Sequence, residues 1–99
     1  MSLIPAEDCT DMSEVRIAID ALDVQIVKLL AKRMRYIEAA ARIKPDRDMV
    51  RDEARKAEVI ANARAAAAEA GFPDALAAAL FETLVEGSIA HEFKAFDER

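Results

Sequence analysis

An unbroken helical repeat of apolar residues constrains the fold of this chain more than any other feature. On one narrow face the apolar side chains recur at helical spacing, at Val15, Ile19, Leu22, Ile26 and Leu30. The pattern runs from Glu14 to Lys44, where Pro45 disfavours helical dihedrals and ends it. At a rise of 1.5 Å per residue, this helix of about 31 residues would be about 46 Å long. The sequence therefore predicts a long first helix, with Ser13 as its N-cap.

The remainder of the chain predicts two shorter helices. One extends from about Met49 to Ala70 and ends at Gly71. The other begins at Asp74, as its cap, and extends to about Phe96. Hydrophobic residues make up 54% of the sequence, with only 2 Gly and 3 Pro, and no stretch alternates like a strand. We predict an all-α fold of three helices in a single domain over residues 1–99.

The length of the first helix predicts an oligomer. A compact domain of about 100 residues has a radius of gyration of about 13 Å, so the two shorter helices cannot cover the whole apolar face of the first. A two-fold dimer with the long helices side by side would cover it in both copies. An extended monomer with an exposed stripe is the alternative. We predict an intertwined homodimer.

Composition argues against several classes of protein. The net charge of −5 argues against nucleic acid and against an anionic membrane surface as partners. With one cysteine, Cys9, and one histidine the chain cannot assemble a Cys/His metal site, so no metal is expected. No apolar run approaches the roughly 20 residues that span a bilayer, and no signal peptide is evident. We expect a cytoplasmic protein.

Two cations interrupt the apolar face of the first helix. Arg33 and Lys44 occupy positions where the pattern requires Leu or Ile. Burying an unpaired charge is expensive, so each needs a partner or access to water. Two interpretations stay open. Either the partner is an anionic small molecule, or Arg33 and Lys44 pair with Asp or Glu of another helix or extend their charged ends to water.

The shorter helices carry further polar candidates. Asp52 and Arg55 have the i, i+3 spacing of neighbours on one helix face, and Ser88 and Glu92 follow an apolar stripe on the third helix. Simpler interpretations exist: a surface pair for Asp52 and Arg55, a hydrogen bond to its own turn for Ser88, and a salt bridge to Lys44 or Arg33 for Glu92. Together the set suits a small dianion with an acceptor oxygen between its carboxylates.

Short motifs in a fixed order extend over about residues 6–97. They are Glu7-Asp8-Cys9-Thr10, Val15-Arg16, Ile19-Asp20, Leu22-Asp23, Leu29-Leu30, Arg33, Lys44, Val50, Asp52, Arg55, Ala70-Gly71-Phe72, Leu80-Phe81 and Ser88. In order and spacing they resemble the all-helical chorismate mutase family. The first of them especially resembles the branch that contains the isochorismate-pyruvate lyases. The resemblance implies an intertwined dimer and an enzyme without a cofactor.

The resemblance also implies roles for single residues. Arg16 matches an arginine donated to the active site of the other subunit, Arg33 one that clamps a substrate carboxylate within the same chain, and Lys44 a lysine that reaches the ether oxygen. Positions near the substrate hydroxyl and carboxylates are matched by Asp52, Arg55 and Ser88. Lys56 departs from the family, because many mutases have there a Glu that contacts the substrate hydroxyl. Glu92 stands where bacterial mutases and the lyases have a Gln that donates to the ether oxygen, although other mutases have Glu.

The resulting expectation is a chorismate mutase, which rearranges chorismate to prephenate in one pericyclic step. Such a reaction requires no nucleophile, metal or cofactor. Arginines would hold the two carboxylates, and Lys44 and Glu92 would stabilise the ether oxygen. An isochorismate-pyruvate lyase, which forms salicylate and pyruvate, is the alternative enzyme. A non-catalytic helical dimer and a metabolite-binding module remain open as well.

Overall fold

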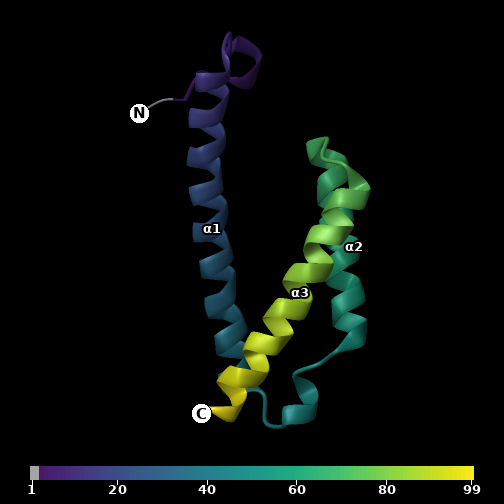
Figure 1. Cartoon of the computed structure of the whole chain (residues 1–99). Coiled ribbons are helices and arrows are strands. Elements are labelled where there is room, and N and C mark those ends of the chain that lie inside the picture. The colour runs from purple at the N-terminus through teal and green to yellow at the C-terminus, as the bar shows by residue number, and fades with distance from the viewer. Residues whose placement is uncertain (1–2) are drawn as a thin grey trace. The chain divides into compact units, whose positions relative to one another are not determined.

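The computed structural model describes residues 3–99, and every regular element in that range is helical. The elements are the short 3-10 helices η1 (Ala6–Asp8) and η2 (Arg47–Met49) and the helices α1 (Met12–Ile43), α2 (Glu53–Ala70) and α3 (Asp74–Asp97) (Figure 1). The prediction of three helices with a long first one is confirmed. The chain divides into two compact units, one up to Arg35 and one over Tyr36–Arg99, and the division falls inside α1.

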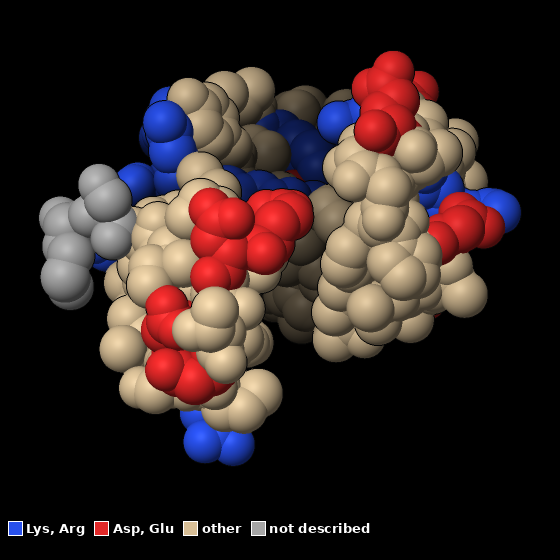
Figure 2. Space-filling model, turned by 90° about the horizontal axis from the view of Figure 1, so that it is seen from above, with Lys and Arg blue, Asp and Glu red and all other residues tan. Residues whose placement is uncertain are grey.

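The first unit begins with a capped helix. The carboxylate of Asp11 accepts the backbone N–H of Glu14 at 2.9 Å, and the carboxylate of Glu14 accepts the backbone N–H and the hydroxyl of Thr10 at 3.2 and 2.8 Å. Acidic side chains gather at this end of α1 (Figure 2). The prediction of Ser13 as the N-cap is wrong by two residues, because Asp11 accepts a free N–H of the first turn while Glu14 reaches back to Thr10 before the helix.

The apolar face of α1 is exposed in the first unit. A single helix cannot cover its own side chains, and nearly half or more of the surface of four large residues on this face meets solvent: Ile19, Leu22, Ile26 and Leu29. An exposed apolar face of this kind usually marks an interaction site.

In the second unit α2 and α3 form a hairpin and lie side by side (Figure 1). Gly71 ends α2 with a φ of 74°, in the left-handed region that glycine adopts without strain, and the N–H of Phe72 turns back to the carbonyl of Ala67 at 2.8 Å. Gly71 was predicted to end this helix, and that prediction is confirmed.

The two shorter helices begin differently from the prediction. α2 starts at Glu53 rather than near Met49, because Asp52 has an extended backbone and its carboxylate accepts the N–H of Arg55 as an N-cap. Asp74 is the first residue of α3 instead of its cap. Its carboxylate is paired with Arg64 of α2, at 2.7 and 2.9 Å, and so is directed across the hairpin.

The core of the second unit is small. Val50, Val85 and Ile89 are buried together, and Val59, Phe93 and Phe96 pack around them. Burial of Val50, just before α2, anchors the connection between α1 and α2 on α3. Within residues 3–99 no helix combines the length and the apolar character needed to cross a membrane.

Candidate functional site

Lys44 and Glu92 form an ion pair in the second unit. The ammonium nitrogen of Lys44 lies 2.7 Å from Oε2 of Glu92 and 3.5 Å from the carbonyl oxygen of Val50. Glu92 is only 4% exposed, whereas about a quarter of the Lys44 side chain, 26%, is exposed. In the chain without a ligand, Glu92 is therefore the partner of Lys44, which is one of the two interpretations that the sequence left open.

The ion pair uses only part of the hydrogen-bonding capacity of the ammonium group. Glu92 is buried on α3, so the positive charge of Lys44 offsets the cost of burying a carboxylate. An ammonium has three N–H donors, and the contacts to Glu92 and Val50 use two of them. The third can meet an acceptor of a ligand from the exposed side.

Ser88 lies one turn before Glu92 on α3 and is also buried. Its hydroxyl donates to the carbonyl of Leu84 at 2.7 Å, in its own turn, as the simpler interpretation of the sequence expects. The buried stretch of α3 thus places a hydroxyl and a carboxylate beside the apolar residues Val85 and Ile89.

Asp52 and Arg55 are exposed and do not pair through their side chains. The carboxylate of Asp52 caps α2, and the guanidinium of Arg55 forms an ion pair with Glu58. In the single chain their roles are those of a cap and a surface pair.

The two remaining arginines of the predicted site lie on α1 within the first unit. Arg16 and Arg33 are about 17 residues apart, which corresponds to about 26 Å along the helix axis. That distance exceeds the length of a small dicarboxylate. Arg16 and Arg33 of one chain therefore cannot bind the same small dianion.

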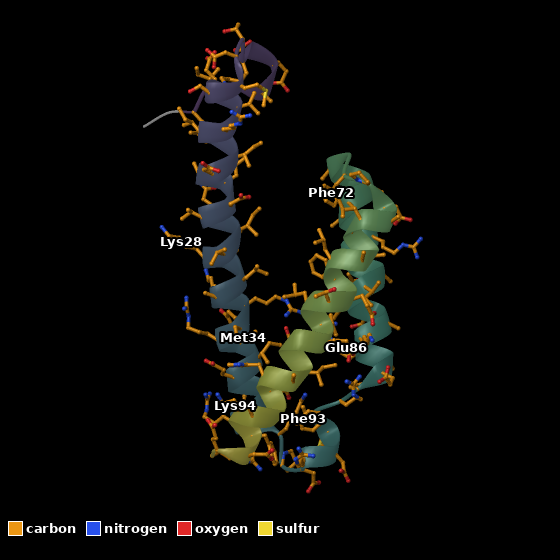
Figure 3. All side chains as sticks on the ribbon, in the orientation of Figure 1. Lys28, Met34, Phe72, Glu86, Phe93 and Lys94 are labelled. Carbon is orange, nitrogen blue, oxygen red and sulfur yellow. The ribbon has the colours of Figure 1, made fainter. Side chains whose placement is uncertain are left out.

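Sequence reasoning missed a charged network between α2 and α3. The ammonium of Lys56 lies 2.7 Å from Glu82 and 2.9 Å from Glu86, and Arg51 binds Glu86 through two hydrogen bonds of 3.1 and 2.8 Å (Figure 3, where Glu86 is labelled). Arg51 also contacts Glu53 at 3.0 Å. The one signal in the sequence is the i, i+4 spacing of Glu82 and Glu86 on the helix that faces two cations.

This network predicts a loss of stability in acid. Hydrogen bonds from Arg51, and then from Lys56, hold the pKa of Glu86 at about 2, below its usual 4.5. A carboxylate whose pKa is lowered by folding stabilises the fold at pH values above its usual pKa. This contribution is lost as the pH falls to the pKa of the folded state. We expect Glu86→Gln to lower the free energy of unfolding at pH 7, with the difference from wild type vanishing as the pH falls towards about 2.

Urea unfolding at a series of pH values measures this difference. Glu69→Gln, an exposed residue of α2, removes the same charge away from the network. An equal pH-dependent difference for both variants would contradict a specific contribution from Glu86.

The functional groups of the candidate site are those of its side chains: an ammonium, guanidinium groups, a hydroxyl and carboxyl groups. Among residues 3–99, the His, Cys, Asp and Glu side chains form no group of three that could hold a metal ion.

Comparisons with known proteins show which family this chain belongs to. The family model described as chorismate mutase type II matches residues 15–93, which include Arg16, Arg33, Lys44 and Glu92. The isochorismate pyruvate lyase of Pseudomonas aeruginosa is 33% identical to this chain over 88 residues. The aligned region covers 89% of this chain and 87% of that relative.

Proposed function

We propose that this chain, which belongs to the chorismate mutase type II family, is an enzyme that rearranges chorismate to prephenate. In this reaction the ether C–O bond breaks as a C–C bond forms, and the ether oxygen gains negative charge in the transition state. The observation that carries the proposal is the ion pair of Lys44 with the buried Glu92, because it holds one ammonium in a fixed place with a donor to spare.

Lys44 is the group that we assign to the ether oxygen. Its ammonium is held by Glu92 at 2.7 Å, so little reorganisation is needed when charge develops on the oxygen. Arginines hold the two carboxylates, because a planar guanidinium binds a carboxylate through two parallel hydrogen bonds. Holding the substrate in its reactive conformer supplies the remaining acceleration. In this proposal Arg16, Arg33 and Arg55 serve the carboxylates, with Asp52 and Ser88 beside them.

The complete site requires two chains. Arg16 and Arg33 are separated by about 26 Å along α1 and cannot serve one substrate from the same helix. The exposed apolar face of α1 also needs a cover. A homodimer with the two copies of α1 alongside each other answers both requirements, and Arg16 then enters the site of the partner subunit.

Isochorismate is the second candidate substrate. The similarity to the relative from Pseudomonas aeruginosa, which is named an isochorismate pyruvate lyase, supports this candidate. In that reaction the same ether bond breaks, a hydrogen moves from the ring to the methylene carbon, and salicylate and pyruvate result. Lys56 affects the choice between the two substrates. It stands where many mutases have a Glu that contacts the substrate hydroxyl, and it forms ion pairs with Glu82 and Glu86.

Incubation with each substrate separately tests the proposal. Chromatography after exposure to chorismate should detect prephenate, and exposure to isochorismate reveals any salicylate. Prephenate formation above the uncatalysed rate supports the mutase, and salicylate formation alone supports the lyase. If neither product forms, calorimetry with chorismate separates a metabolite-binding module, which releases heat, from a helical dimer that binds nothing.

Glu92→Gln tests whether this position also serves the ether oxygen. The carboxylate accepts from the ammonium of Lys44 but cannot donate a hydrogen bond, whereas the amide of a glutamine can. Because the amide is a permanent donor of nearly the same shape, we expect Glu92→Gln to keep or raise turnover at neutral pH.

Steady-state turnover of wild type and Glu92→Gln at neutral pH measures the effect. Glu69→Gln serves as the control for loss of a carboxylate elsewhere in the second unit. An inactive Glu92→Gln would contradict a role at the ether oxygen and leave Glu92 as the ion-pair partner of Lys44.

A further inference from the structure

The carbonyl groups at the end of α1 lack a normal helical partner. The carbonyl of Ala41 would accept the N–H of the residue four positions later, but that residue is Pro45, which has none. Ala41 is fully buried, so water cannot replace the missing donor. Arg99 supplies it: one guanidinium nitrogen donates to the carbonyls of Ala41 and Lys44 at 3.2 and 2.6 Å, and the other to that of Pro45 at 3.2 Å.

A second arginine, Arg47, joins the end of α1 to the end of α3. Arg47, just after α1, binds the carboxylate of Asp97 through two hydrogen bonds of 2.9 and 3.2 Å, and its guanidinium lies 4.4 Å from the ring centre of Phe93 (Figure 3, where Phe93 is labelled). The guanidinium of Arg99 in turn lies 3.7 Å from the ring centre of Phe96. Arg99 thus holds the backbone of the segment from Ala41 to Arg47, and the last turn of α3 holds its Arg47 side chain.

Lys44 lies in the middle of this segment. Its carbonyl oxygen accepts from Arg99, two residues beyond α3, and its ammonium donates to Glu92 of α3, so both ends of the lysine are fixed. The side chain of Lys44 has four rotatable bonds, and its ammonium is placed only if the backbone that carries it is placed.

We propose that Arg99 is a positioning residue for Lys44. It replaces the donor that Pro45 lacks and holds the backbone at the end of α1. It thereby keeps the ammonium beside the oxygen of the ether C–O bond that breaks. The activity part of this inference rests on the proposed function, whereas the clamp on the backbone does not. Because a displacement of about 1 Å can cost about 10²-fold in rate, we expect Arg99→Ala to lower kcat by about 10- to 100-fold with little change in KM.

The experiment compares Arg99→Ala with Arg42→Ala, which removes the same charge from an exposed position in the last turn of α1. Both changes are also made in the Lys44→Ala background. If Arg99 acts through Lys44, Arg99→Ala should cause no further loss of kcat in that background. Arg99→Lys keeps the charge but not the planar guanidinium, so it should give an intermediate kcat. If Arg99→Ala does not fold, Arg99→Lys is compared with wild type in its place.

Hydrogen exchange followed by mass spectrometry provides a readout that needs no activity. The amides of residues 44–50 should exchange faster in Arg99→Ala than in wild type or in Arg42→Ala. With an active wild type, an unchanged kcat in Arg99→Ala, or the same loss in the Lys44→Ala background, would overturn the inference. If wild type converts neither substrate, the proposed function fails and the exchange rates alone decide: unchanged rates would overturn the clamp.

Discussion

Lys44→Ala is expected to lower turnover by about 10²–10³-fold, the usual cost of removing one preorganised donor from a site where charge develops. The ammonium of Lys44 is held in place by Glu92, so its loss removes a fixed donor that mobile solvent cannot replace. Lys44 follows the last residue of α1 and is partly exposed, so the fold should remain. Steady-state kinetics with chorismate and isochorismate measures the loss.

The ion pair adds an effect on stability that must be separated from catalysis. Lys44→Ala leaves the buried carboxylate of Glu92 without its ammonium, which should lower the free energy of unfolding by about 1–3 kcal/mol. Glu92→Gln in the Lys44→Ala background removes the unpaired carboxylate charge. It should restore much of the lost free energy of unfolding without restoring turnover. Lys94→Ala, on the exposed side of α3, controls for loss of a lysine. Near-normal turnover of Lys44→Ala on both substrates would refute the role of Lys44.

Arg16→Ala is expected to lower kcat/KM by about 10²-fold or more. A guanidinium that holds a carboxylate makes two charge-assisted hydrogen bonds, each contributing about 1.5–3 kcal/mol. Arg16 is exposed on α1, so thermal unfolding should be nearly unchanged. Arg35→Ala removes the same charge from another exposed position of that helix and should remain active. Equal kinetics for the two variants would show that Arg16 does not contact the substrate.

The helices were predictable because their signals are local. Pro45, Gly71 and Pro73 mark the breaks, and between them apolar residues recur at helical spacing. The starts of the helices were less predictable. Several residues near each start can act as a cap, and which one does depends on competition between neighbouring carboxylates: Asp11 replaces Ser13, and Asp52 shortens α2.

The candidate site was predictable in composition but not in pairing. Periodicity placed Lys44 and Glu92 on inward faces, yet it could not say whether they meet each other or a ligand. That depends on contacts between residues 48 positions apart in the sequence. The Lys56 network and the Arg99 clamp escaped prediction for the same reason, since their partners lie 26 to 58 positions away. Only packing of α3 in the second unit brings these charges together.

The central claim is a two-chain site in which Lys44 of one subunit and Arg16 of the other act on the same substrate. Mixing inactive Arg16→Ala subunits with inactive Lys44→Ala subunits tests it most directly. In an exchanged dimer one site carries both defects and the other carries neither. Random exchange of equal amounts should therefore restore about a quarter of the wild-type sites. Recovery near that level, measured after mass spectrometry has verified exchange, is the expected result. No recovery despite complete exchange would contradict the claim and assign each site to one chain.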